Sequence, residues 1–491
     1  MAAEEKKVML RSVDGVYFVV PEREAAQSMF IEDKIFDCPA NYIIPSDGDE
    51  TKYKPIRLPV QRHTLSKVLH YCQRHASGDD DPDWDADFIT SVDQETLYDL
   101  ILASYYLQIH GLLDLVCHAV ATKIKGKSPS EICNIFNIKS VITPELDSQP
   151  CTSVQSLQEK PCLNQLELEE KALRALHIVR CQNFTRYDPK LYYFVCSRFN
   201  YFNLALFDHD KESSFTRGLP LHKIPSRMRD SMVRACLNVI SLKIDESDVG
   251  FPINVFGTVI ARDQVDYRCV YLFRRERDDP QLISSDDDGL ALTDPCRGLV
   301  VLDEVYFEVD LKIKCDGGEI KDFSRGVVAF ERGRLPTGDS TMSLGIITCL
   351  SSVELACAYV HQPAEATIWI NVLKGPCNIS RVAAATPGNF KDHIILYEAS
   401  ADPLQVGLGE GGSVPLTRRV VAVSLDRKLA LFIVGGDVFE HLALTLGHSD
   451  QVIYRRLGAT QLEVKVTWTA VTKKPRSNIF KVVGNQRLLL C

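Results

Sequence analysis

The chain has 491 residues, of which 45% are hydrophobic and 25% charged, and its net charge at pH 7 is −9. These proportions are typical of a globular protein, and the length predicts two or three domains. Residues 1–140 hold 15 basic and 22 acidic side chains, and this acidic balance argues against binding to nucleic acid.

The N-terminus lacks the apolar segment of a signal peptide, and no run of about 18 apolar residues follows, so we expect no membrane partner. Sixteen cysteines are scattered without a CxxC pair, which favours reduced thiols. His70, Cys72 and His75 lie close together on a predicted amphipathic helix. No second ligand pair follows at zinc spacing, so we expect no metal and no cofactor.

The first 90 residues predict a hairpin, a helix, a strand and a second helix in that order. Residues 8–21 are expected to form a β-hairpin, because two apolar runs flank Asp14-Gly15. Residues 22–36 predict a helix, residues 56–59 a short strand, and residues 61–76 a second helix with a regular apolar face. An acidic turn then leads into a helical segment.

Three helices are predicted between Asp93 and Ile138. Asp93 is a candidate N-cap for a helix over residues 94–107, and His110-Gly111 is expected to end it. A second helix covers residues 112–124, and Ser128 opens a third, with Pro and Glu following at the positions of a capping box. The pattern fits either an ordinary helical subdomain or an apolar shelf offered to another protein.

Residues 6–138 resemble the S-phase kinase-associated adaptor family, which links cullin to F-box proteins in SCF ubiquitin ligases. The matching segments occur in the family's order: LRSVDGVYFVV, RLPV followed by LSKVLHYCQRH, WDADFITSVDQETLYDLILASYYL, and GLLDLVCHAVATKIKGKSPSEICNIFNI. The resemblance implies a BTB/POZ-like α/β fold and a non-catalytic adaptor of the cytoplasm and nucleus.

In that family the strand–helix core and the first of the three helices contact cullin, whereas the later helices hold the F-box on an apolar shelf. By position, the resemblance implies cullin-binding residues at Ser104, Tyr105 and Tyr106. It implies F-box-binding residues at Leu113, Val116, Cys117, Val120, Ile124, Pro129, Ile132, Ile135, Phe136 and Ile138. We expect this shelf to be uncovered in the chain and to await a foreign helical motif.

The chain departs from the family at two places. Tyr105 stands where the family has Asn, and a bulky phenol there is expected either to clash with cullin or to act as an aromatic anchor. The family ends with an acidic helix that carries a Trp and completes the F-box clamp. This chain has no Trp between Trp84 and Trp369, so the resemblance does not extend to that helix.

Residues 146–162 are rich in Ser, Gln and Pro and predict a linker, which separates a first domain at 1–145 from a second part at 163–491. The second part begins with an amphipathic helix over residues 163–180. We expect solvated charges on this helix at Glu167, Glu169, Glu170, Lys171 and Arg174.

Short strands separated by turn residues then predict a mostly-β, sandwich-like domain of roughly 250 residues. The strands are expected at residues 250–262, 267–274, 299–314, 365–373, 392–397, 419–424, 428–434 and 461–469. Residues 230–470 resemble an uncharacterised β-rich domain common in grass proteins, through FGTVIARD and LTDPCRGLVVLDEVYFEVDLKIK. No activity and no ligand come with this resemblance.

Three patterns in the β-rich part are candidate sites of catalysis or ligand binding. Glu308 and Asp310 are two residues apart as in paired catalytic carboxylates, but Lys312 on the same face favours a solvated strand. Residues 407–412 (GLGEGG) favour a hairpin turn over a phosphate loop. Aspartates at 278–279 and 286–288 fit a solvated loop better than a calcium pocket.

The family resemblance therefore implies a non-catalytic adaptor that links cullin to F-box proteins in an SCF-type ubiquitin ligase and promotes proteasomal degradation. The alternative is a degenerate, adaptor-derived interaction module that acts through its β-rich domain without assembling a ligase. An enzyme in the β-rich domain has little support, because no nucleophile elbow or other catalytic constellation is present.

Overall fold

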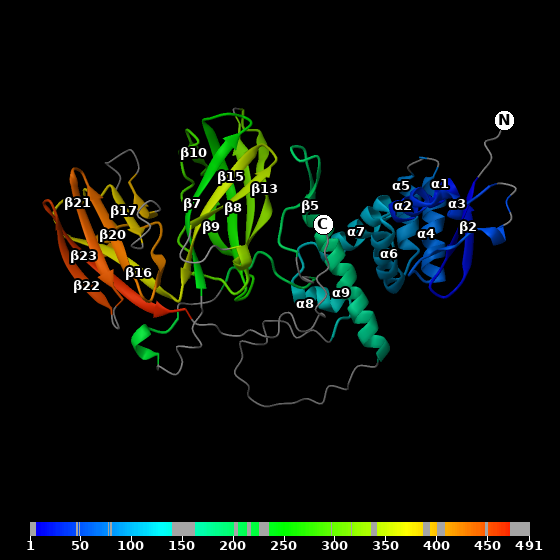
Figure 1. Cartoon of the computed structure of the whole chain (residues 1–491), viewed down its shortest axis with the longest axis horizontal. Helices are drawn as coiled ribbons and strands as arrows, with labels where there is room; N and C mark the ends of the chain where they lie inside the picture. The colour runs from blue at the N-terminus through cyan, green and yellow to red at the C-terminus, as the bar shows by residue number, and fades with distance from the viewer. Residues whose placement is uncertain are drawn as a thin grey trace. The chain divides into compact units, whose positions relative to one another are not determined.

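The computed structural model divides the chain into two compact units (Figure 1). The first unit comprises Met1–Phe184 and Asn200–Phe207, and the second comprises Thr185–Phe199 and Asp208–Arg476. The structure describes residues 6–45, 48, 50–76, 78, 81–139, 163–200, 205–213, 218–224, 235–295, 297–315, 317–334, 341–385, 393–399, 408–446 and 450–471.

A small sheet forms one side of the first unit. Its strands are β1 (Lys7–Arg11), β2 (Tyr17–Pro21), β3 (Ile43–Ile44) and β4 (Ile56–Arg57). β1 pairs antiparallel with β2 and β3 and parallel with β4. The predicted hairpin is confirmed, and Gly15 has a φ of +88° in its turn, a conformation that favours glycine.

Helices build the rest of the first unit. They are α1 (Glu22–Ala25), α2 (Met29–Asp37), α3 (Pro39–Tyr42), α4 (Arg62–His75), α5 (Pro82–Thr90), α6 (Gln94–Leu107), α7 (His110–Ile124), α8 (Pro129–Ile135) and α9 (Leu163–Phe184). The single helix predicted over residues 22–36 is therefore two helices. Ser28 separates them, since its side chain accepts a hydrogen bond from Ile31 and donates one to the carbonyl of Leu107.

The ends of α6 to α8 follow the local sequence with one exception. Asp93 caps α6, and Ser128 and Glu131 form the predicted capping box at the start of α8. However, α6 ends at Gln108, which has a φ of +53°, rather than at Gly111. Gly111 instead lies in the first turn of α7, where a Cβ atom would sit 2.7 Å from the hydroxyl of Tyr71.

The second unit begins with a hairpin and then forms a first β-sandwich. The hairpin consists of β5 (Thr185–Asp188) and β6 (Tyr193–Cys196). One sheet has the order β10-β8-β12-β13 with β9 on β8, and the other has the order β11-β7-β15-β14. The strands are β7 (Ala235–Ser247), β8 (Ile253–Asp263), β9 (Val270–Arg275), β10 (Gln281–Ile283), β11 (Leu299–Val300), β12 (Glu304–Lys314), β13 (Ile320–Glu331), β14 (Thr341–Thr348) and β15 (Ser351–His361).

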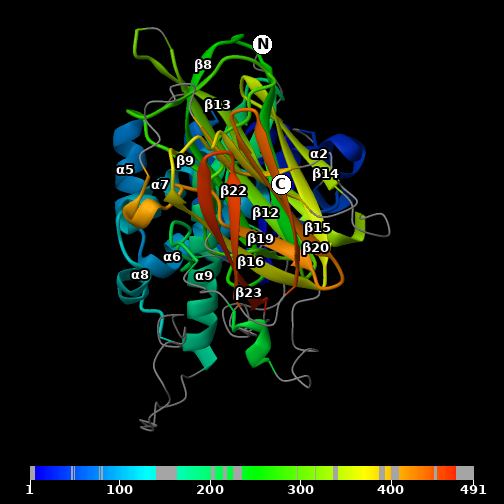
Figure 2. The same cartoon turned by 90° about the vertical axis from the view of Figure 1, so that its left-hand side faces the viewer.

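A second sandwich follows directly from β15. Its sheets have the orders β19-β16-β23-β22 and β18-β17-β20-β21, and Figure 2 shows β16, β23 and β22 side by side. The strands are β16 (Pro363–Lys374), β17 (Arg381–Ala385), β18 (Ile394–Glu398), β19 (Val420–Ser424), β20 (Lys428–Gly435), β21 (Val438–Thr445), β22 (Gln451–Leu457) and β23 (Thr460–Ala470).

Each sandwich has its own apolar core, so the expectation of one sandwich is wrong. The two are joined inside the same unit by buried contacts. The side chain of Asn238 on β7 forms two hydrogen bonds with the backbone of Ala422 on β19, at 2.8 and 2.9 Å. A single core stops growing as a chain lengthens, which is why two smaller cores bury these strands.

Candidate partner-binding surfaces

The ten residues that the resemblance assigned to F-box binding are called the shelf here, and the structure places all of them on α7, on α8 or beside them. Ile135 is exposed, and Ile124 and Pro129 are partly exposed. The others are buried: Leu113, Val116, Cys117, Val120, Ile132, Phe136 and Ile138. Burial raises the pKa of the Cys117 thiol to about 12. The shelf is therefore a covered surface.

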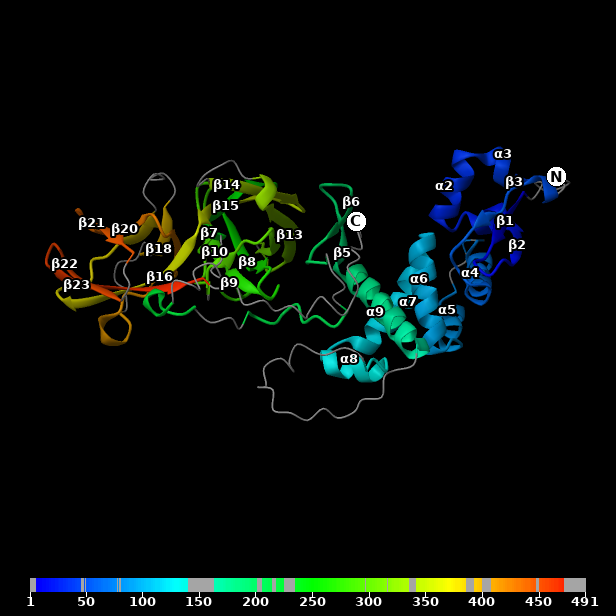
Figure 3. The ribbon, with the colours of Figure 1, turned by 60° about the horizontal axis from the view of Figure 1, so that its bottom comes forward.

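The cover is α9, which lies beside α6 and α7 (Figure 3). Ala172, Leu173, Leu176 and Val179 of α9 are buried in the same apolar cluster as the buried shelf residues. Leu176 and Val179 have no exposed surface at all. The expectation of an uncovered shelf is therefore wrong for the part on α7, because α9 of the same chain packs against α7 and α6.

Polar contacts fix α9 at both ends and in the middle. Near its start, the Glu169 carboxylate accepts a hydrogen bond from the backbone N–H of Lys139 at 3.1 Å. In the middle, the Lys171 ammonium lies 2.9 Å from Asp99 and 3.3 Å from Glu95, both on α6. Near the end, the Gln182 amide donates to the Asp114 carboxylate on α7 at 2.8 Å.

These contacts alter the titration of the groups involved. Partial burial alone would lower the pKa of Lys171, but the hydrogen bonds and negative charges of Asp99 and Glu95 raise it. Burial and then the charge of Glu169 raise the pKa of the Cys133 thiol on α8. The sequence expectation of a solvated Glu169 is wrong, since its side chain is buried.

The sequence missed α9 as part of this surface, although one signal was present. Residues 172–179 are apolar or small on nearly every side, and only Arg174 in that segment is exposed. A helix that is apolar all round is a buried helix rather than an amphipathic one. The partners Asp99 and Glu95 lie more than 70 residues away, and no local pattern connects them with Lys171.

The residues assigned to cullin binding differ in exposure. Ser104 is fully buried and donates a hydrogen bond to the carbonyl of Ile101. Tyr105 is partly buried against the core of the first unit, whereas Tyr106 is 42% exposed. Of the three, Tyr106 is the most exposed.

Tyr106 belongs to an exposed apolar surface shared by α2 and α6. Its ring centroid lies 5.0 Å from that of Phe30, and the Lys34 ammonium sits over the Phe30 ring at 5.9 Å. Met29 is 45% exposed and Phe36 is 85% exposed. We call Met29, Phe30, Lys34, Phe36 and Tyr106 the α2–α6 face. Exposed apolar surface of this kind is a candidate site of protein contact.

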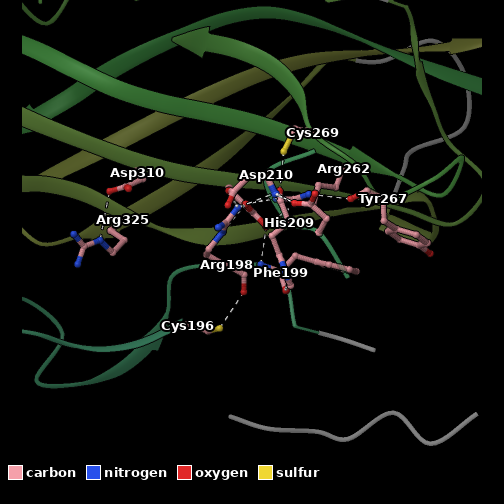
Figure 4. Close-up of polar contacts among 12 residues, drawn as sticks. Cys196, Arg198, Phe199, His209, Asp210, Arg262, Tyr267, Cys269, Asp310 and Arg325 are labelled. Carbon is pink, nitrogen blue, oxygen red and sulfur yellow. Dashed lines mark hydrogen bonds and ion pairs between the residues drawn. The ribbon is translucent and has the colours of Figure 1, made fainter. Parts of the chain in front are cut away.

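The two carboxylates proposed as a pair on β12 have different partners: Asp310 lies 3.5 Å from Arg325 and is partly exposed, whereas Glu308 belongs to a buried charge network around Arg262 (Figure 4). Arg262 on β8 is fully buried and donates to both carboxylate oxygens of Glu308, at 2.6 and 2.9 Å. It also donates to the carbonyls of His209 at 2.7 Å and Tyr267 at 3.0 Å. Glu308 was expected on a solvated face, and that expectation is wrong.

The other candidate sites also have structural roles. His75 contacts Asp85 at 3.0 Å, and His70 packs edge-on against Trp84, so both fasten α5 to α4. The backbone N–H groups of Ser284 and Ser285 donate to Asp288, which makes Asp288 a turn residue. Within the described ranges, no group of three or more His, Cys, Asp or Glu side chains is arranged to hold a metal ion.

Comparison with known proteins gives two families for the two units. A model of the Skp1 family, dimerisation domain, matches residues 110–148. SKP1-like protein 1 of Oryza sativa subsp. japonica is 41% identical over 175 residues, an alignment that covers 94% of that protein and 30% of this chain. The chain belongs to the Skp1 family. SKP1-like protein 1A of Arabidopsis thaliana is 40% identical over 159 residues, with 92% of it and 29% of this chain covered.

Another Skp1-family relative carries a functional name. The E3 ubiquitin ligase complex SCF subunit sconC of Arthroderma otae is 38% identical over 163 residues, which cover 92% of it and 30% of this chain. The second unit matches a domain of unknown function (DUF6598) over residues 236–459, a stretch that runs from β7 to the turn before β23. Both resemblances drawn from the sequence are confirmed. The first unit is called the Skp1-like unit below.

No helix in the described part of the chain is long and apolar enough to cross a membrane.

Proposed function

We propose that the protein is a non-catalytic adaptor of an SCF-type ubiquitin ligase, and that it joins cullin through its Skp1-like unit. One observation carries the proposal: the chain contains nearly the full length of proteins such as SKP1-like protein 1, at 41% identity over 175 residues. The helices and small sheet of this unit agree with a BTB/POZ-type fold. The relative sconC is named as a subunit of an SCF ligase complex.

The α2–α6 face is the surface proposed to meet cullin. Phe36 and Tyr106 are the exposed aromatic side chains on it, and aromatic anchors contribute most of the binding free energy in many interfaces. Lys34 adds a positive charge beside the Phe30 ring. Tyr105, the departure from the family, packs against the core of its own unit, which favours neither a clash nor a direct anchor.

The proposed location is the cytoplasm and nucleus. The described cysteines are free thiols, and such thiols persist in reducing compartments. F-box proteins are the second partner that the family resemblance implies. Their capture on the shelf requires α9 to leave it, because both would bury the same apolar side chains.

We expect Phe36→Asp and Tyr106→Asp to weaken the binding of the full chain to the N-terminal domain of a cullin. A buried aspartate without a partner costs several kcal/mol, so the dissociation constant should rise by about tenfold or more. Isothermal titration calorimetry measures the change. Tyr454→Asp is the matched control, since Tyr454 is 57% exposed but lies on β22 in the second unit.

The second candidate function is an adaptor-derived interaction module that does not assemble a ligase. The covered shelf favours this candidate, because an adaptor of the family exposes that surface to its receptor. The same titration separates the two functions. Measurable cullin binding that both substitutions weaken supports the adaptor, whereas no binding by the unaltered chain would leave the interaction module as the function.

A further inference from the structure

We propose that α9 takes the place of an F-box helix, so that the chain carries its β-rich unit as its own substrate-binding module instead of recruiting a separate F-box protein. The inference rests on the proposed adaptor function. Beyond that function, it assigns α9 to the shelf and substrate binding to the β-rich unit.

Burial shows that α9 packs tightly against α7, which carries half of the shelf residues. Leu173 is 5% exposed, and Leu176 and Val179 are fully buried in one cluster with Val116 and Val120 of α7. Apolar side chains are the part of a helix that an apolar groove recognises. An F-box helix that approached from another protein would find these contacts already made.

The polar contacts show that α9 has one defined position on the shelf. Glu169 is a buried carboxylate, and it is stabilised because it accepts hydrogen bonds from the N–H of Lys139 and from the Gln165 amide, both at 3.1 Å. A buried carboxylate without such donors is strongly destabilising. Lys171 then pairs with two carboxylates on α6, so a shift of the helix by one turn would break both sets of contacts.

Residues 205–207, which belong to the first unit although they follow the hairpin of the second, also contact α9. The Arg180 guanidinium donates to the carbonyl of Phe207 at 2.9 Å. Ala205 is buried in the cluster that contains α9 and the shelf. The C-terminal half of α9 is therefore enclosed on more than one side, and displacement of the helix would expose several buried residues at once.

The β-rich unit follows α9 directly in the chain, so α9 connects it covalently to the Skp1-like unit. α9 ends at Phe184, and β5 of the second unit begins at Thr185. Any protein that holds α9 on its shelf therefore holds the two sandwiches by the same link. An occupant in the same chain also has an effective concentration of about millimolar, which a separate F-box protein does not reach.

The test measures binding of a purified F-box domain to the full chain, with SKP1-like protein 1 of Oryza sativa as the reference adaptor. We expect the chain to bind this domain about a hundredfold more weakly than the reference does, because the tethered α9 competes for the shelf. Equal affinity for the two adaptors would overturn the proposal.

Charge reversal of Lys171 decides whether α9 is the reason. We expect Lys171→Glu to strengthen F-box binding by about tenfold or more, since it places a third negative charge beside Asp99 and Glu95 and loosens α9. Arg174→Glu is the matched control, because Arg174 is exposed and its ion pair is with Glu170 on the same helix. A second reversal, Asp99→Lys added to Lys171→Glu, should restore the weak binding.

Each result has a defined meaning. A shelf that binds weakly because the family's terminal helix is missing would gain nothing from Lys171→Glu, and that outcome would contradict the proposal. Equal gains for Lys171→Glu and Arg174→Glu would contradict it as well, because they would indicate a general loss of structure. Circular dichroism of each variant checks the fold. Cullin binding, measured on the same samples, tests the adaptor function separately from the occupancy of the shelf.

Discussion

His177 is a titratable residue buried within α9, and its surroundings make it a probe of that helix. It is 1% exposed, and its ring lies 3.5 Å from the sulfur of Cys181. Burial and then the positive charge of Arg180 lower the pKa of His177 to about 4. The unfolded chain binds this proton at the ordinary value of 6.5, so the folded state binds fewer protons between the two values.

The stability of the Skp1-like unit should therefore fall as the pH is lowered from about 6.5 to about 4. The limit for this one residue is about 3 kcal/mol, since each pKa unit is worth about 1.4 kcal/mol. Urea unfolding at a series of pH values measures the slope. The substitution His177→Gln should flatten the dependence of stability on pH. The control His222→Gln, which alters an exposed histidine of the second unit, should leave that dependence unchanged. An unchanged slope in His177→Gln would show that the residue is protonated alike in both states.

Individual residues also show which sequence expectations hold. The capping box of Ser128 and Glu131 formed as expected, because a cap depends on residues three positions apart. Glu308 lies on the face of β12 that was expected to be solvated, yet its side chain is buried. Its partner Arg262 lies 46 residues away on β8, and strand pairing brings the two together. Local spacing predicts local contacts, and a buried ion pair between strands has no local pattern.

Among the elements, α9 has the largest effect on the interpretation of the chain. Its existence was predicted from residue 163, and the structure extends it to Phe184. Its position was not predicted, because the shelf it covers is formed by helices far earlier in the sequence. The three helices before it were predicted, but α6 ends at Gln108 and α7 begins at His110, where the sequence was expected to break.

We expect Leu176→Asp to release α9 from the shelf, because a carboxylate at this fully buried position has no partner. Hydrogen–deuterium exchange should then rise in peptides from α7 and from α9. Leu166→Asp is the matched control on the same helix, since Leu166 is 44% exposed. If α7 exchanges equally fast in the unaltered chain and in Leu176→Asp, then α9 does not protect the shelf.

At the scale of the whole molecule, the chain joins a Skp1-like unit to two sandwiches that match a domain of unknown function. The α/β fold of the first unit was implied by the family resemblance, and periodicity and turns predicted some strands of the second unit but missed others, such as β7, β13 and β15. The number of sandwiches was not, because each strand alternates in the same way whether one core or two receive its apolar side. We propose that the Skp1-like unit acts as the adaptor and that the β-rich unit of the same chain binds the substrate.

The central claim is that the shelf of this adaptor is occupied by its own helix while the unit still joins cullin. Native mass spectrometry of the full chain, mixed with a cullin N-terminal domain and an excess of F-box domain, tests both parts together. The account predicts a complex of the chain and cullin without the F-box domain. A ternary complex that contains all three proteins would contradict it.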